Sequence, residues 1–208
     1  MVVDNFDKIK ELMRFDESGD VFYFVQIMQR KKDGADILKN NRIINNYYIT
    51  SLQYLDDRAE EIRNLCRQFH ARAYIGINPC SFKKCCMYGI KELAEINITG
   101  RYRDILNLMP TLAGKYPGIE GKEKFWVIDY DSKDKEGVAK LRGFICRANG
   151  KDGAGIDKIK TILPTKNGYH LLSLPFDPRG FSEFVKDKFD FEVDIHKSAP
   201  TLLYFEEK

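Results

Sequence analysis

The chain alternates between two patterns of hydrophobic and polar positions. Apolar residues that recur every three or four positions indicate helices, and short runs rich in Val, Ile and aromatic residues indicate strands. In the first half these patterns predict a helix, two strands, a helix, a strand and two helices, over residues 7–15, 21–28, 45–50, 52–69, 71–77, 83–95 and 102–112. The helix over 52–69 has the clearest signal, because Ser51 stands at its N-cap position and an apolar stripe follows. Strand, helix and strand over 45–77 predict an α/β unit.

The second half predicts the order β-α-β-β-α-β, followed by one extra strand. The expected strands and helices lie, in chain order, over residues 125–130, 134–147, 159–163, 169–174, 178–189, 191–196 and 201–205. Asp177 and Pro178 are the expected cap and first residue of the second helix, and Asn167-Gly168 is a hairpin signal. This is the split βαβ order of ferredoxin-like and RNA-recognition-motif sheets, so the fold class is α+β.

A loop over residues 115–124, containing Pro117, Gly118 and Gly121, separates the two halves. We therefore expect an N-terminal α/β module over 1–120 and a second module over 121–208, packed as one compact domain. The 208 residues, 43% of them hydrophobic, suffice for such a core.

Charge and cysteine content narrow the functional classes. The net charge of +3 is too small for nucleic-acid binding by bulk charge, so any basic surface is local. An odd number of cysteines, five, argues against a secreted disulfide framework and favours the reducing cytosol, here of a microbial cell. No apolar run reaches membrane-spanning length, so no membrane partner is expected.

Acidic and imidazole side chains gather on the predicted strands of the second half. Asp129 and Asp131 end the first strand, His170 is on the third and Asp194 on the fourth. In the usual arrangement of this fold, the first strand lies between the third and the fourth. Alternation puts the three aspartates on the face away from the helices, but it does not decide the face of His170. If His170 shares that face, all four side chains converge.

Convergent carboxylates suit divalent metal ions, Mg²⁺ or Mn²⁺, that hold a triphosphate and activate a hydroxyl for in-line attack. The histidine would then meet a phosphate. The simpler interpretation is a strand that ends in a solvated acidic turn, with Asp194 exposed and His170 satisfied within the sheet. Their joint placement on neighbouring strands favours a site.

These motifs resemble those of the archaeo-eukaryotic primase superfamily, which includes primase-polymerases. Residues 127–131, Val-Ile-Asp-Tyr-Asp, are similar to its first motif, residues 164–170 to its second, and Val193-Asp194 to its third. The resemblance covers residues 125–196. It implies that the N-terminal unit and a recognition-motif-like unit together form a primase-like catalytic core.

The resemblance also implies roles for individual residues. Asp129, Asp131 and Asp194 would bind metal and, with His170, carry catalysis. The nucleotide-binding candidates are Thr165, Lys166, Asn167, Gly168, His170 and Lys197. Some members have serine where this chain has Gly168, and Thr165 is the hydroxyl available to replace it. The implied partners are nucleoside triphosphates, a single-stranded DNA template, and a replicative helicase or polymerase on another chain.

Two other functions use the same features. A recognition-motif-like binding module without catalysis would need basic and aromatic residues where the three acids stand, because phosphates repel carboxylates. A metal-dependent nuclease would use the same acids. The phosphate-binding character of the turn before His170 favours nucleotide synthesis over cleavage.

Further candidates have plainer interpretations beside the functional ones. The basic turn over 29–34 is either a solvated loop or a phosphate contact. Five cations are either solvated on the surface or grip a template strand: Arg72, Lys83, Lys84, Arg101 and Arg103. Tyr74, Tyr88 and Tyr102 pack in the core or stack on a base. A zinc site could use Cys80, Cys85 and Cys86 together with Cys66 or His70. Because these residues lack paired C-x-x-C spacing, buried or free thiols are favoured over a zinc site.

Overall fold

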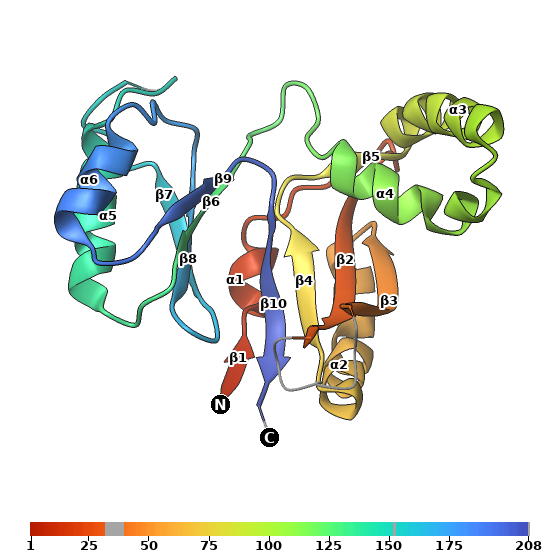
Figure 1. Ribbon diagram of the computed structural model, residues 1–208, viewed down its shortest axis with the longest axis horizontal. Helices are drawn as coiled ribbons and strands as arrows, with labels where there is room; N and C mark the ends of the chain where they lie inside the picture. The colour runs from red at the N-terminus through yellow and green to blue at the C-terminus, as the bar shows by residue number, and fades with distance from the viewer. Residues whose placement is uncertain (32–39, 152, 208) are drawn as a thin grey trace.

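The computed structural model describes residues 1–31, 40–151 and 153–207 and divides their strands between two antiparallel sheets (Figure 1). The first sheet runs in the order β1 (Val2–Asp4), β10 (Pro200–Glu206), β4 (Arg72–Gly76), β2 (Val21–Gln29) and β3 (Arg42–Ile49), with β5 (Cys80–Ser81) paired to β2. The second runs in the order β7 (Ile159–Pro164), β8 (Tyr169–Ser173), β6 (Trp126–Tyr130) and β9 (Asp194–His196). Helices combined with antiparallel sheets confirm the α+β class.

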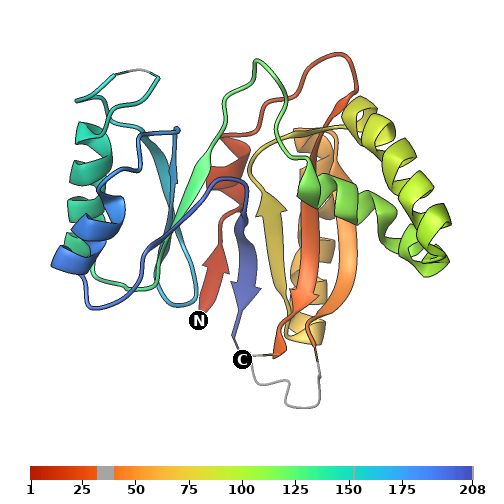
Figure 2. The same ribbon diagram turned by 45° about the horizontal axis from the view of Figure 1, so that its top comes forward.

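Helices pack against both sheets (Figure 2). The helices α1 (Phe6–Lys10) and α2 (Leu52–Phe69) pack on one face of the first sheet, and α5 (Lys135–Arg147) and α6 (Phe181–Lys188) pack on the second. At the far end of the first sheet lie α3 (Phe82–Thr99), the 3-10 helix η2 (Tyr102–Asn107) and α4 (Leu108–Lys115). Within the described residues, no helix combines the length and apolar character needed to cross a bilayer.

Alternation along β2 explains how the first sheet is covered. Val25 and Ile27 are fully buried against α2, whereas Phe24, Gln26 and Met28 point to the opposite face and are half-buried. The predicted cap of α2 is confirmed, because the Ser51 hydroxyl accepts a hydrogen bond of 3.0 Å from the backbone nitrogen of Tyr54.

The second sheet has the predicted strand order. β6 lies between β8 and β9, and its residues alternate between two cores. Ile128 and Tyr130 pack under α5 and α6, while Val127 and Leu172 face the first sheet and join its core. The inner face of the second sheet is therefore turned toward the N-terminal half.

The last strand belongs to the other sheet. Residues 201–205 were expected in the second module, but β10 pairs with β4 and β1 of the first sheet. Its Leu203 and Tyr204 are buried with the residues that pack against α2. The chain thus returns to its N-terminal half, and Thr201 of β10 contacts His170 of β8 across the junction of the two sheets.

Several predicted ends are wrong by a few residues. The first helix stops at Lys10, and the last strand of the second sheet is only Asp194–His196. α6 begins at Phe181 rather than Pro178, because Gly180 adopts φ +76° and the Asp177 carboxylate accepts from the Arg179 backbone nitrogen instead of capping the helix. The basic turn over 29–34 falls partly outside the described residues.

Candidate functional site

Asp129 stands at the centre of the second sheet's inner face. It is paired directly with His170 of β8 on one side and with Asp194 of β9 on the other. Directly opposed residues bring their Cβ atoms to about 4.5–5.5 Å. Asp131, which directly follows the end of β6, is exposed and lines the same cavity as Asp129. Strand register therefore sets His170, Asp129 and Asp194 side by side across three neighbouring strands.

His170 lies on the inner face, the alternative that alternation left undecided. Its Nε2 atom is 3.3 Å from Asp129 Oδ1, and its Nδ1 atom is 2.8 Å from Thr201 Oγ1. The side chain is 13% exposed, so both ring nitrogens are fixed by neighbours in a largely buried position. Thr201 comes from β10, which means that the first sheet orients a side chain of the second.

The turn before His170 is closed by its own hydrogen bonds. The Thr165 backbone nitrogen donates to the Gly168 carbonyl at 2.9 Å, and the Gly168 nitrogen donates to Thr165 Oγ1 at 3.0 Å. A Cβ atom at position 168 would collide with backbone atoms of Tyr130 and Ser132. Glycine is therefore required here by close packing against the end of β6. The hairpin itself is confirmed, since β7 pairs with β8.

A cavity of about 200 Å³ opens between the two sheets at this point. Its acidic side consists of Asp129 of β6 and Asp131, which follows the end of that strand. Its basic side consists of Arg30 at the end of β2, Arg72 at the start of β4 and Lys166 from the turn. Since the two signs come from different elements, the cavity presents carboxylates to one part of a bound molecule and cations to another.

The cations of this cavity are held by aromatic rings. Arg72 is only 7% exposed and lies 4.9 Å from the centroid of the Phe205 ring, and Lys166 lies 5.2 Å from the same centroid. Lys166 also pairs with Glu207 at 3.1 Å, and this contact lowers the pKa of the Glu207 carboxyl. Cation–π contact keeps both charges near the cavity mouth.

The carboxylates meet only part of the requirement for a metal centre. In the portion of the chain that the structure describes, no three His, Cys, Asp or Glu side chains surround one point closely enough to hold an ion. The donor chemistry nevertheless suits a hard cation, which prefers carboxylate oxygens. Asp194 is exposed and directly opposite Asp129 in the strand register, so these two carboxylates are the nearest candidates for a shared ion.

The predicted site residues divide by location. Thr165, Lys166, Asn167 and His170 line the cavity with Asp129 and Asp131. Gly168, Asp194 and Lys197 do not line it. Asp194 lines a separate cavity beside α6, and the Lys197 Nζ atom lies 5.2 Å from the centroid of the Trp126 ring.

Two residues that line the cavity were not expected there from the sequence. Leu202 comes from β10, whose sheet the sequence did not predict, and Arg30 lay in a turn for which a solvated loop was the alternative to a phosphate contact. The only signal for Arg30 was the basic cluster that follows β2.

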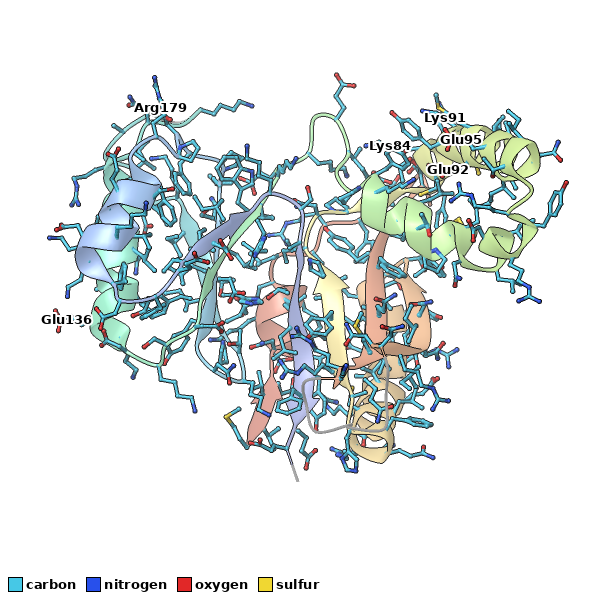
Figure 3. All side chains as sticks on the ribbon, viewed as in Figure 1. Lys84, Lys91, Glu92, Glu95, Glu136 and Arg179 are labelled. Carbon is cyan, nitrogen blue, oxygen red and sulfur yellow. The ribbon has the colours of Figure 1, made fainter. Side chains whose placement is uncertain are left out.

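Several other candidate residues lie outside the cavity. Lys84, in the set considered for gripping a template, is in the first turn of α3, where its ammonium donates to the Gly118 carbonyl at 3.0 Å (Figure 3). Cys66, Cys80 and Cys85 are buried, and burial raises the thiol pKa of Cys66 and Cys80 to about 12, which disfavours the thiolate that binds zinc.

No protein-family model matches the chain, and neither a curated protein nor a solved structure matches it.

Proposed function

We propose that the protein is a metal-dependent, template-directed nucleotidyltransferase, a small primase or primase-polymerase. The observation that carries the proposal is the register of the second sheet, which sets Asp129 between His170 and Asp194 at a cavity with a basic opposite side. Two-metal nucleotidyl transfer requires carboxylates that hold the metal ions. It also requires cations near enough to bind the phosphates of the same nucleotide.

The charge distribution supports a nucleotide more than it supports a bare nucleic-acid surface. Asp129, Asp131 and Asp194 would hold Mg²⁺ or Mn²⁺, which would polarise the reacting phosphate and lower the pKa of the attacking hydroxyl. Arg72 and Lys166 would bind the remaining phosphate oxygens by charge-assisted hydrogen bonds. A sheet used only to bind nucleic acid would lack the acids.

His170 would act on the leaving side of the triphosphate. Thr201 fixes its Nδ1 atom, so the edge that carries Nε2 is directed at Asp129 and the cavity. An imidazole in that position donates a hydrogen bond to a phosphate oxygen and stabilises charge that accumulates on the departing pyrophosphate. Lys166 and Asn167, from the turn before it, would contact the same phosphates.

The proposal extends to the whole chain. The two sheets would form a primase-like catalytic core, with the incoming nucleoside triphosphate at the second sheet and a single-stranded DNA template alongside. A helicase or a replicative polymerase on another chain would supply unwinding and further extension.

Substitution of the acids tests the proposal. Asp131→Ala is the sharper variant, because Asp131 is exposed, whereas Asp129→Ala also removes the contact with His170. We expect both variants to lose nucleotide incorporation on a primed or unprimed single strand. We expect Asp131→Ala to keep its stability within about 0.5 kcal/mol. Glu136→Ala is the matched control, since Glu136 lies on the outer side of α5 (Figure 3).

Synthesis retained in both aspartate variants would end the proposal. The same reactions, run with an end-labelled strand, detect cleavage. Metal-dependent shortening of the strand that disappears in Asp131→Ala, without any incorporation, would assign the site to a nuclease.

A further inference from the structure

A second and larger cavity, of about 410 Å³, adjoins the site described above. Its floor is the open face of the first sheet, formed by Phe24, Gln26 and Met28 of β2 and by Tyr74 of β4. Ala113 and Gly114 of α4 line its opposite side. Arg30, Tyr74 and Pro200 line both cavities, so the two spaces meet at these residues.

The lining selects a planar ring. Phe24, Met28 and Tyr74 present flat or adaptable apolar surfaces, and small residues on α4 leave space above them. The Gln26 amide is oriented by its Nε2 atom, which donates to Asn46 Oδ1 at 3.0 Å. An oriented amide offers a donor and an acceptor side by side, which is the arrangement that pairs with the edge of a nucleobase.

A cation stands at the mouth shared by the two cavities. The Arg30 guanidinium donates from Nη1 to the Tyr74 hydroxyl at 3.1 Å and is thereby held between them. An anionic group attached to a ring in the larger cavity would reach this guanidinium. Small-molecule sites of this kind are mostly apolar, span about 300–1,000 Å³ and contain a few placed polar groups.

We propose that the larger cavity binds a nucleotide, with its base between the face of β2 and β4 and helix α4, and its phosphate at Arg30. The lining by itself selects a planar ring with an anionic group; the choice of a nucleotide rests on the proposed function. The nucleotide would come either free from solution or as one unit of a single strand.

Filling the cavity tests the inference. A Cβ atom at Gly114 would meet no other atom within 4 Å, and Gly114 is in a helix, so Gly114→Leu is expected to occupy the space without strain. Gly143→Leu, on α5, is the matched control. Gly76→Val fills the cavity from the β4 side and replaces Gly114→Leu in the test if that variant melts below the wild type. A Cβ atom at Gly76 makes only an ordinary contact of 3.7 Å, so Gly76→Val should be tolerated.

The probes are adenosine monophosphate, a short single-stranded oligodeoxyadenylate, and the same oligonucleotide with abasic units, each titrated without divalent metal. We expect Gly114→Leu and Arg30→Ala to lose at least about tenfold in affinity for one of the two base-containing probes, with Gly143→Leu unchanged. Loss for the monophosphate identifies a free nucleotide as the occupant. Loss for the oligonucleotide identifies a unit of a strand as the occupant. In that case the abasic oligonucleotide should bind the wild type as weakly as the intact oligonucleotide binds the filled variants.

Unchanged affinity for both probes in the filled variants would overturn the inference. The proposed function is judged separately by Asp131→Ala. If the filled variants bind both probes normally while Asp131→Ala abolishes synthesis, only the inference about the larger cavity fails. If Asp131→Ala synthesises normally while the filled variants lose binding, only the catalytic assignment fails.

Discussion

His170 shows how one residue connects the two halves of the site. It contacts Asp129 on the neighbouring strand and Thr201 on a strand of the other sheet. A histidine with a partner at each ring nitrogen has a fixed ring orientation. Such an orientation suits a group that must meet a phosphate at one point, and it makes the role of His170 separable from that of the carboxylates.

At this scale we predict that His170→Ala weakens binding of the incoming nucleotide by roughly ten- to a hundredfold, the effect of losing one charge-assisted contact of about 1.5–3 kcal/mol. Manganese binding to the carboxylates should persist, because the metal ligands are other residues. Calorimetric titration of nucleotide and of manganese, with a melting curve, measures both. Thr201→Val, which removes only the tether of Nδ1, should give a smaller loss of the same kind. Unchanged nucleotide affinity with a lowered melting temperature would make His170 a purely structural residue.

At the scale of elements, the contact between β3 and α2 depends on a buried phenol. Tyr47 is 5% exposed, and its hydroxyl donates to Glu61 Oε1 of α2 at 2.9 Å. Burial, and then the hydrogen bond to Glu61, raise the pKa of Tyr47 to about 12. In the unfolded chain a tyrosine ionises near pH 10. The folded state therefore keeps a proton that the unfolded state releases.

This difference predicts that stability is lost in alkali. The contribution of Tyr47 is fully present below about pH 10 and declines as the pH rises toward about 12. The phenylalanine of Tyr47→Phe cannot ionise, so the free energy of unfolding of this variant should fall less steeply over this pH range than that of the wild type. The expected difference in the fall is about 1 kcal/mol, or about 2–4 °C in Tm. Thermal melts at pH 8, about 10 and about 11 compare the two proteins. Because the pKa of Tyr204 is also about 12, the stability of the variant should still depend on pH to some extent. Parallel curves for both proteins would show that Tyr47 does not titrate in this range.

At the scale of the molecule, the two sheets share one hydrophobic core and a few buried hydrogen bonds. Asn78, at the end of the segment after β4, is 2% exposed and binds both backbone groups of Phe125 just before β6. Asn5 spans the same junction on the other side, donating to the carbonyls of Pro164 and Leu202. These amides fix where β6 begins relative to the first sheet, and therefore where Asp129 meets the basic residues.

We predict that Asn78→Ala is strongly destabilising, because it leaves a buried N–H and a buried carbonyl of Phe125 without their partner. The expected loss is about 2–4 kcal/mol, or roughly 5–15 °C in Tm. Asn97→Ala, an exposed position on α3, is the matched control and should change stability little. Chemical denaturation at one temperature measures the difference. A loss in Asn78→Ala no larger than in the control would mean that this junction contributes little to the fold.

The amino-acid sequence by itself determined the features that depend on local periodicity. The buried run before Asp129, the capped helix after Ser51 and the β-α-β-β-α-β order of the second half follow from apolar spacing and turn residues, and the structure has all three. Because strand order follows from that pattern, the neighbours of Asp129 were also predictable.

Only the tertiary structure decided what depends on contacts between distant segments. The pattern of residues 201–205 predicts a strand but not its sheet, and burial of Leu203 and Tyr204 against the α2 side joined it to β4. That pairing brought Thr201 Oγ1 to 2.8 Å from His170 Nδ1, a contact that orients the imidazole ring and that no local pattern predicts. Arg30 and Arg72 reached the carboxylates for the same reason: their place is set by how two sheets pack, and no local pattern encodes that packing.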